Sequence, residues 1–418
     1  MKKMKDSGIE WIGEIPEGWD VSRSKNIFRQ RTSKGNSVEV LLAATQKAGM
    51  IPQNQIEGVV QVKIETDLQQ FRTVHINDFV ISLRSFQGGF EFSSYEGVCS
   101  PAYQVFYNYK NISHKYFRYL FKSDGFIQKM NSLTVGIREG KNIQYNDFAN
   151  SLIPFPPLPE QQRIADYLDA LCGEIDSAIE KLMQIIEKLQ EYKRSLITQV
   201  VTKGLNPKVK MKESGIDWIG EIPEGWELNK INRLFYSIGS GTTPKDEEDF
   251  IGDIHWIQSG DINGGILDCS EKKVNQNTIN KYTALKIFKA PYIIVAMYGA
   301  SVGNVSISTI NGCVNQACCV LSNPVQVLQY SFYAILALKP YLIWKAIGGG
   351  QPNISQAVVK QLRIPNPPLS EQQQIADYLD DKCSKIDAVI AKKQALIEKL
   401  TAYKKSLIYE VVTGKREI

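Results

Sequence analysis

One stretch of the sequence contains residue types that could transfer a methyl group. Asn366-Pro-Pro-Leu matches three letters of the Asn-Pro-Pro-aromatic signature with which amino-methyltransferases act on an extruded base. The aromatic that would stack on the base is Leu369 here, and Phe155 replaces the asparagine in a second copy of the stretch. No glycine-rich strand-to-helix turn for S-adenosylmethionine precedes it. Methyl transfer by this chain is therefore not expected.

Three other candidate sites lack part of the pattern that their chemistry needs. The stretch Gly239-Ser-Gly-Thr-Thr-Pro stops short of G-x-G-x-x-G, because Pro244 stands in the place of the third glycine. Asp261 with Glu271-Lys272-Lys273 has the acidic-x-Lys spacing of a nuclease, but this spacing is common by chance. The three histidines are scattered, which predicts neither a catalytic triad nor a metal site. We therefore predict a binding protein without catalytic or metal-ligating residues.

Composition is that of an ordinary globular protein. The 418 residues allow two or three domains, and 43% hydrophobic with 22% charged residues argues against disorder. A net charge of +5 favours an anionic partner only weakly, so nucleic-acid binding must be argued from the layout of the chain. Seven cysteines without a CxxC pair indicate free thiols, and no apolar run approaches membrane-spanning length. We expect a soluble protein of the cytoplasm.

The chain repeats itself once. Residues 4–28 return with small changes at 211–235, and 153–168 return at 364–379. A period near 210 residues indicates a duplicated domain and not a solenoid. Each repeat has an opening motif with two tryptophans, a variable block, a proline-rich hinge and a long helix. The flanks are nearly copied while the blocks have diverged, which is typical of a protein that holds two different ligands at a fixed separation.

The tryptophans of the opening motifs are expected to pack on a neighbouring surface. These residues are Trp11 and Trp19, repeated as Trp218 and Trp226. Stacking on nucleic-acid bases is the alternative, but aromatic side chains mostly serve cores.

Two long amphipathic stretches predict the element that organises the chain. Residues 160–201 and 371–412 carry apolar side chains at alternating steps of four and three, the pattern of a coiled coil of about 60 Å. The predicted seam contains Ile164, Leu168, Leu171, Ile175, Leu182 and Leu189 in the first helix, and Ile375, Leu379, Ile386, Leu396 and Leu400 in the second. Two matched helices joined by a folded domain can lie antiparallel as a spacer. A spacer with no docking role is the alternative to a subunit interface.

The predicted fold class is α+β. Two mixed α/β domains stand in tandem, separated by two long helices that form an antiparallel coiled coil. The expected divisions are 1–152 for the first domain, 153–205 for a hinge and central helix, 206–363 for the second domain, and 364–418 for a second hinge and C-terminal helix.

The copied motifs resemble the specificity subunit of type I restriction–modification systems. The shared features are the IPxPPLxEQQxIADYL junction, a helix ending in KxSLIxxVVT and the SGIxWIGEIPEGW opening motif. In the second block, Gly241-Thr-Thr-Pro and Val314-Asn-Gln match the pattern of that family. The resemblance covers essentially the whole chain. It implies two target-recognition domains, each reading one half of an asymmetric bipartite DNA site, with the paired helices setting the spacer.

The resemblance also implies partners. These are double-stranded DNA, two modification (methyltransferase) subunits docked on the helices, and a restriction (nuclease-translocase) subunit. Catalysis would belong to those subunits, so this chain would hold no cofactor, and S-adenosylmethionine, ATP and magnesium are expected on the partners only.

The residues that contact DNA are expected in polar turns after strands. Base edges are read by Arg, Lys, Asn, Gln, Ser and Thr, and arginine to guanine is the commonest specific contact. In the first block we expect contacts from Arg84, Ser85 and Gln87, and from Arg138 and Lys141. In the second block we expect them from Thr242, Thr243, Lys245, Tyr298, Ser301, Asn304, Gln351 and Asn353. A solvated loop position is the alternative for each residue.

Two other classes of protein stay open at this point. A coiled-coil adaptor that reads no nucleic acid predicts no salt-dependent, sequence-selective binding. A self-contained nuclease or methyltransferase predicts activity from the purified chain alone.

Overall fold

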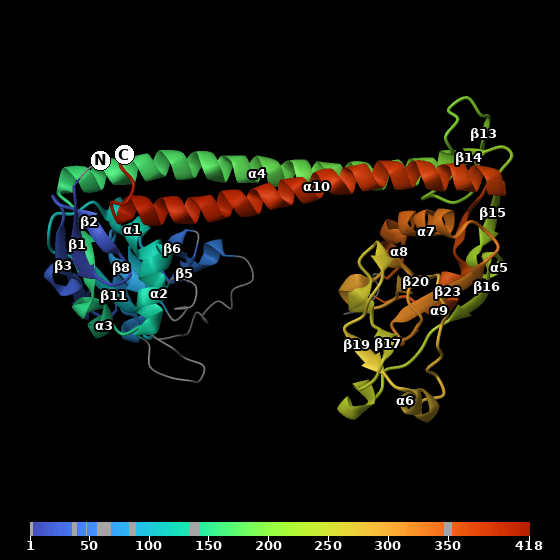
Figure 1. Cartoon of the computed structure of the whole chain (residues 1–418), viewed down its shortest axis with the longest axis horizontal. Coiled ribbons are helices and arrows are strands. Elements are labelled where there is room, and N and C mark those ends of the chain that lie inside the picture. Colours follow the sequence, from blue (N-terminus) through green and yellow to red (C-terminus); the bar gives the residue numbers. More distant parts are fainter. Residues whose placement is uncertain are drawn as a thin grey trace. The chain divides into compact units, whose positions relative to one another are not determined.

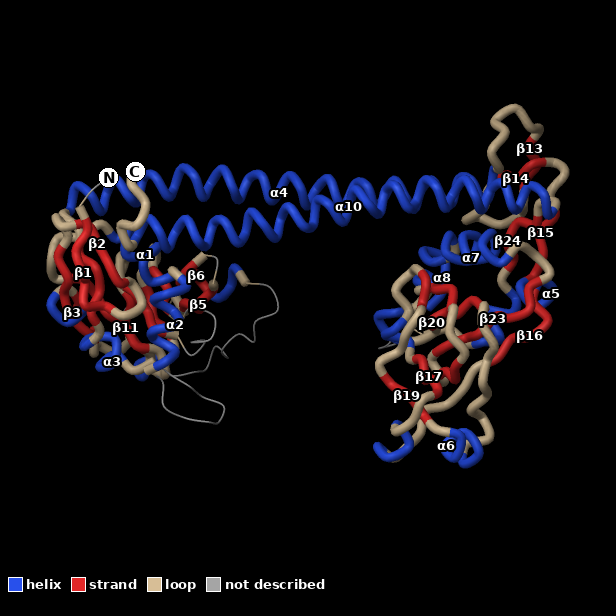
Figure 2. Tube along the Cα trace, in the orientation of Figure 1, coloured by secondary structure: helices blue, strands red, loops and turns tan. Residues whose placement is uncertain are grey.

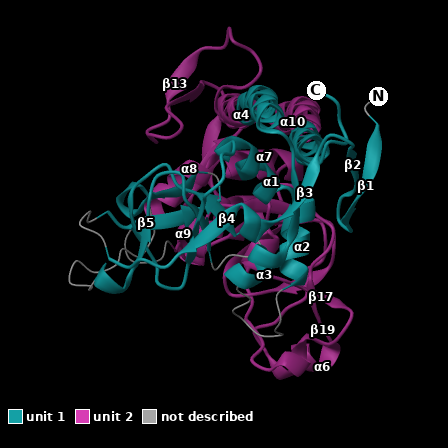
Figure 3. Cartoon of the chain, turned by 90° about the vertical axis from the view of Figure 1, so that its left-hand side faces the viewer, with its two compact units in different colours: residues 1–183, 394–418 teal, residues 184–393 magenta. Residues whose placement is uncertain are grey.

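The computed structural model describes residues 3–35, 40–46, 48–56, 68–82, 89–133, 143–346 and 353–418. They form two compact units, which Figure 3 colours separately. Unit 1 is residues 1–183 with 394–418, and unit 2 is residues 184–393. Each unit therefore contains one globular block and one segment of each long helix. No helix within the described ranges is long and apolar enough to cross a membrane.

The long helices are α4, Leu158–Lys203, and α10, Leu369–Val412. Within each unit their segments pack antiparallel, and Figure 1 shows the two ribbons side by side. In unit 1, Lys404 Nζ lies 2.6 Å from Asp176 Oδ2. In unit 2, Lys193 Nζ lies 2.7 Å from Asp387 Oδ2, which is the same pair with the roles of the helices exchanged. The predicted α+β class with paired long helices is therefore confirmed.

The inner face of these helices keeps the heptad spacing but not the predicted register. From Cys383 to Val411, eight steps that alternate between three and four residues join buried or half-buried positions and cover 28 residues, or 3.5 residues a step. One row of the predicted seam, which contains Leu396, lies one residue before the row that faces inward, which contains Ile397. Leu396 is consequently 45% exposed, so its predicted place in the seam is wrong. In α4, Cys172 is buried at 4% while Leu171 beside it is only half-buried.

The other seam residues lie on or beside the inner face. Buried are Ile164, Leu168, Ile175, Ile375, Leu379 and Ile386, and half-buried are Leu182, Leu189 and Leu400.

Unit 1 is built on a four-stranded antiparallel sheet of order β4-β11-β8-β9. Its strands are β1 Met4–Ile9, β2 Gly13–Pro16, β3 Asp20–Arg23, β4 Phe28–Arg31, β5 Leu42–Thr45, β6 Gly49–Pro52, β7 Arg72–Val74, β8 Phe79–Ile81, β9 Phe90–Phe92, β10 Gly97–Cys99, β11 Gln104–Asn108 and β12 Leu152–Phe155. Its shorter helices are α1 His114–Lys122, α2 Asp124–Ser132 and α3 Tyr145–Asn150. Phenylalanines fill the core, and the Phe106 and Phe148 rings are 4.7 Å apart. Helix α1 adds Phe117 and Phe121, four residues apart on its inner face.

Unit 2 is built on a five-stranded sheet of order β16-β23-β20-β21-β18 and a smaller sheet β19-β17-β22, visible as red strands in Figure 2. Its strands are β13 Met211–Glu213, β14 Glu221–Pro223, β15 Glu227–Lys230, β16 Phe235–Gly239, β17 Ile254–Ile257, β18 Ile266–Leu267, β19 Lys272–Val274, β20 Tyr292–Ala296, β21 Val305–Ser308, β22 Gly312–Val314, β23 Cys318–Pro324 and β24 Arg363–Asn366. Its shorter helices are α5 Ile231–Leu234, α6 Gln276–Lys281, α7 Leu328–Ala337, α8 Lys339–Ala346 and α9 Gln356–Gln361.

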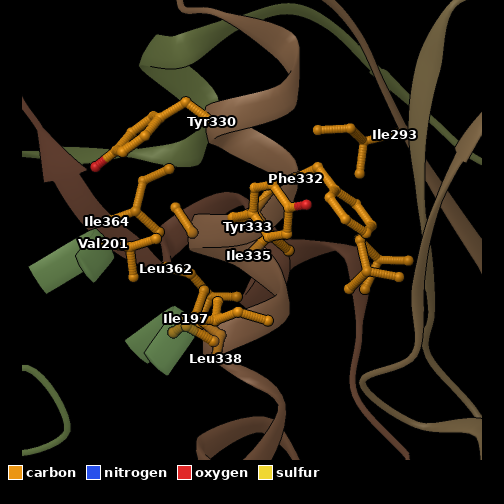
Figure 4. Close-up of a cluster of buried hydrophobic side chains, with 14 of the residues drawn as sticks. Ile197, Val201, Ile293, Tyr330, Phe332, Tyr333, Ile335, Leu338, Leu362 and Ile364 are labelled. Atoms are coloured by element: carbon orange, nitrogen blue, oxygen red, sulfur yellow. The ribbon is translucent and has the colours of Figure 1, made fainter. Parts of the chain in front are cut away.

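Helix α7 is apolar on nearly every side because it lies between the sheet and the long helices. Figure 4 shows Phe332 beside Ile293 of β20, and Ile335 and Leu338 near Ile197 of α4. These contacts fix the block of unit 2 onto its long-helix segments, since each buried large apolar side chain stabilises the fold by about 1.5–3 kcal/mol.

The copied junctions have a structural explanation. Gln161 at the start of α4 accepts a hydrogen bond at Oε1 from Ser113 N (2.9 Å) and donates from Nε2 to Pro156 O (2.8 Å). Gln372 of α10 does the same with Val327 N (2.9 Å) and Pro367 O (2.8 Å). Both glutamines are almost fully buried, so each must keep both partners. This explains why the EQQ letters recur.

The opening motifs pair with the hinges. Strand β3 is antiparallel to β12, and β15 is antiparallel to β24. Trp19 is 1% exposed and Trp226 is 2% exposed, so these two indoles pack on neighbouring parts of the protein as predicted, while Trp11 and Trp218 are half-buried.

Candidate nucleic-acid interface

Three strands of unit 2 meet at one edge of its larger sheet. Strand β16 ends at Gly239, which pairs with Val320, and β20 ends at Ala296, which pairs with Cys318 at the start of β23. The loops that leave these strands therefore lie next to one another. We call residues 240–245, 298–301 and 315–317, with Asn353, the loop edge of unit 2.

Backbone hydrogen bonds tie these loops together. Met297 N donates to Ala317 O over 2.7 Å, and Ile354 N donates to Met297 O over 2.9 Å. Tyr298 also forms an isolated bridge with Asn353. The loop edge is thus a connected surface and not a set of independent turns.

Two segments that are far apart in the sequence lie in contact here. A Cβ atom on Gly241 would lie 1.8 Å from Val314 O, so only glycine allows this approach. The Ser240 hydroxyl donates to Cys318 O over 2.7 Å. Thr243 Oγ1 donates to Gln316 Oε1, also over 2.7 Å. The Gly241-Thr-Thr-Pro and Val314-Asn-Gln segments therefore form one structure.

Other side chains of the second block form hydrogen bonds that support the loop containing Thr242 and Lys245. Trp256 Nε1 donates to Thr242 O over 3.1 Å. The Tyr282 hydroxyl accepts from Lys245 N (3.0 Å) and donates to Asp249 Oδ2 (2.8 Å). Burial alone would raise the pKa of Asp249, but hydrogen bonds from Tyr282 and Lys281 lower it below its ordinary value. Asp249 therefore stays ionised and holds Tyr282 in place.

The structure places most of the second-block predictions at this edge. Thr243, Lys245, Tyr298 and Asn353 are exposed there, while Thr242 and Ser301 are half-buried. Asn304 differs, because Nδ2 donates to Ile262 O (2.9 Å) and Oδ1 accepts from Lys339 Nζ (2.7 Å). Asn304 thus fixes its turn from within. Contact between these residues and DNA bases remains a prediction.

The remaining predicted residues lie outside the described ranges. They are Arg84, Ser85, Gln87, Arg138, Lys141 and Gln351.

Unit 1 has a polar hollow at the corresponding edge of its sheet, where β4 ends and β11 begins. The hollow has a volume of about 370 Å³ and is lined by Gln30, Arg72, Gln104 and their neighbours. Gln104 Nε2 donates to Ile143 O over 3.0 Å, and its Oε1 accepts from Tyr145 N over 2.8 Å. These residues were not among the predicted contacts. Their position at strand ends is the signal that could have identified them.

Cationic side chains also line the outer strand of this sheet. Arg29 lies 4.4 Å from the ring centre of Tyr109, and Arg31 lies 4.6 Å from that of Tyr107. Arg31 also forms a two-point ion pair with buried Asp78, at 2.7 and 2.9 Å. The hydrogen bond to Asp78 raises the pKa of Arg31, so its charge is permanent. The Asp78 carboxylate balances the charge of Arg31, so this pair holds β4 in place, while Arg29 is exposed on the same strand.

Comparison with known proteins gives the family. The family described as Type I restriction modification DNA specificity domain matches residues 16–191 and 223–399. A putative type I restriction enzyme MjaX specificity subunit from Methanocaldococcus jannaschii is 26% identical, over 97% of this chain and 95% of that protein. The type I restriction enzyme MjaVIII specificity subunit of the same organism is 25% identical, over 96% and 93%.

A solved structure shows the same fold. A chain from a study of complex assembly and conformational transition of the type I R-M system superposes with a TM-score of 0.72. It is 16% identical and covers 96% of this chain and 99% of that chain. With two copies of the specificity domain and two matched units, the chain belongs to the family of type I restriction–modification specificity subunits, which recognise DNA and are not themselves catalytic.

Proposed function

We propose that each unit reads one half of an asymmetric, bipartite DNA target. The observation that supports this proposal is that the two units share one fold but carry different residues at corresponding places. The loop edge of unit 2 presents Thr243 and Gln316, whereas the polar hollow of unit 1 presents Arg72 and Gln30. Different hydrogen-bonding groups select different base edges, so the two half-sites would differ in sequence.

The long helices would dock two modification subunits. Ile185 and Tyr192 of unit 2 are 39% and 57% exposed, and Leu396 and Tyr403 of unit 1, at the equivalent positions, are 45% and 43% exposed. Apolar side chains seven residues apart suit a partner helix that packs along this face. Because the same stripe occurs once in each unit, two copies of one partner would be bound. A restriction subunit would join that complex.

Cofactors would then be bound by the partners. Across the ranges that the structure describes, no group of three or more His, Cys, Asp or Glu side chains could hold a metal ion. On the proposed function, S-adenosylmethionine, ATP and magnesium would be used by the modification and restriction subunits.

The test is co-purification with the methyltransferase encoded by the adjacent gene, followed by mapping of methylated positions in DNA exposed to the complex. We expect one bipartite motif with two unlike, sequence-specific halves and an unspecified gap. A chain that binds a partner but supports no motif would favour the adaptor class. Methylation or nicking by this chain alone would favour the self-contained enzyme. Replacing Ile185 and Leu396 with aspartate is expected to prevent co-purification. Glu187→Lys and Glu398→Lys are the controls, because these exposed positions lie about 200° around each helix from Ile185 and Leu396.

A further inference from the structure

We propose that Gln316 reads a guanine in the half-site of unit 2, and that Thr243 is the positioning residue that orients its amide. This inference rests on the proposed function, because it assigns one base contact within the DNA target. Gln316 was not among the residues expected to bind DNA. It is exposed, and it lies between the loops that leave β16 and β20.

The hydrogen bond from Thr243 fixes which end of the amide faces outward. Thr243 Oγ1 donates to Gln316 Oε1, so the carbonyl end is directed toward the threonine. Gln316 Nε2 has no hydrogen-bond partner among the residues that the structure describes, and a primary amide nitrogen carries two N–H groups. The side chain therefore offers a pair of donors to a ligand at this edge.

Both members of the pair are held rigidly. The backbone before Thr243 cannot shift toward Val314, because Gly241 is already packed against that carbonyl. Trp256 Nε1 holds the carbonyl of Thr242 over 3.1 Å. On the other side, Asn315 N donates to Ile257 O over 3.0 Å, which anchors the turn that carries Gln316. Contacts that are ordered before binding lose less conformational entropy when the ligand arrives.

A pair of donors matches guanine best among the four bases. In the major groove, guanine presents two neighbouring acceptors, N7 and O6, whereas adenine presents one acceptor and one donor. To read adenine, glutamine must direct both its carbonyl and its amino group at the base. The bond to Thr243 opposes that orientation, because Oε1 is held toward the hydroxyl. Guanine is therefore the base that the fixed amide selects.

Methylation mapping of the whole complex tests the two roles separately. Gln316→Ala is expected to relax one position of one half-site, with guanine preference falling roughly 10- to 100-fold, as expected for a lost two-point base contact. Gln316→Glu should shift the preference at that position to cytosine, because a carboxylate accepts from cytosine N4. The other half-site should stay unchanged in both variants.

The threonine variants test positioning. Thr243→Val removes the hydroxyl at nearly constant shape, so the amide can turn and the same position should accept adenine as well as guanine. Thr243→Ser keeps the hydroxyl and should retain the guanine preference. Gln361→Ala, at an exposed glutamine of α9, serves as the control and should leave the motif unchanged.

The possible outcomes separate the two proposals. A wild-type complex without a bipartite motif would contradict the proposed function. A normal wild-type motif that Gln316→Ala leaves unaltered would contradict the base contact alone. Equal loss of specificity in both half-sites would mean that the substitution disturbs the fold. Circular dichroism of each purified complex detects that case, and Gln316→Glu then decides the base contact, because a new cytosine preference requires a folded site.

Discussion

The Tyr333 hydroxyl donates a hydrogen bond to Asp380 Oδ1 over 2.6 Å, which ties α7 to α10 inside unit 2. The same arrangement occurs in unit 1, where the Tyr119 hydroxyl donates to Asp169 Oδ1 over 2.8 Å. Burial and the hydrogen bond to the carboxylate both raise the pKa of Tyr333, so it remains a neutral donor. Each globular block is thus fastened to a long helix by the same tyrosine–aspartate pair.

Tyr333→Phe is expected to lower the free energy of unfolding by about 1–2 kcal/mol, because it removes a hydrogen bond to a charged group. The loss should be moderate, since Gln329 Nε2 still donates to Asp380 over 2.7 Å. Urea unfolding of the full chain measures the change. Tyr236→Phe is the matched control, because Tyr236 is 82% exposed and should change the stability by less than about 0.5 kcal/mol. Equal effects of the two substitutions would contradict the role assigned to Tyr333.

Gly241→Ala is expected to weaken target recognition by the half-site of unit 2. The added Cβ would lie 1.8 Å from Val314 O, so the loop that carries Thr243 must move away from Gln316. Methylation of the wild-type motif should fall at least tenfold, corresponding to about 1.4 kcal/mol.

Gly260→Ala provides the control for that substitution. A Cβ at Gly260 meets nothing within 4 Å in the described structure, and its methylation rate should stay close to wild type. A Gly241→Ala complex with an unchanged rate and motif would show that the close approach to Val314 is not needed for reading.

Glu91 makes the stability of unit 1 depend on pH. Its side chain is 4% exposed, and burial raises the pKa of this carboxyl above its ordinary value of 4.5, although Lys122 Nζ lies 2.6 Å away and opposes the rise. The folded state therefore binds this proton more tightly than the unfolded state. The stabilisation is present at low pH and is lost as the pH rises from 4.5 through the raised pKa.

Glu91→Gln should remove that pH dependence, because the amide stays neutral throughout. The melting temperature of the variant relative to wild type is expected to be higher at about pH 8 than at about pH 5. Exposed Glu10→Gln in the same unit changes the same charge and should show no such trend. A constant difference between Glu91→Gln and wild type across this range would mean that the carboxyl is already ionised at low pH in the folded state.

The sequence alone predicted the elements that are copied and missed those that depend on three-dimensional packing. The hinges, the long helices and the α+β class follow from repeated letters and apolar periodicity. The exposure of Leu396 was missed because the apolar pattern allows two neighbouring registers, and the packed helices turn Ile397 inward in its place. The contact between Gly241 and Val314 depends on strand order, since β16 and β22 belong to different sheets. Residues of the loop edge such as Gln316 can be recognised as candidate DNA contacts only once the order of those strands is known.

The length of the helix pair is expected to set the gap between the half-sites. Four residues inserted after Met183 in α4, and four after Lys393 in α10, lengthen each helix by about 6 Å, the length of about two base pairs. A helix pair that acts as a stiff spacer predicts that methylation mapping will show a gap about two base pairs longer, with both half-site sequences unaltered. The same four residues inserted after Pro207, in the exposed segment that follows α4, should leave the gap unchanged. A helix insertion that supports methylation at the original gap would show that the helices do not define the separation, and a changed half-site sequence would show that they do more than space the units.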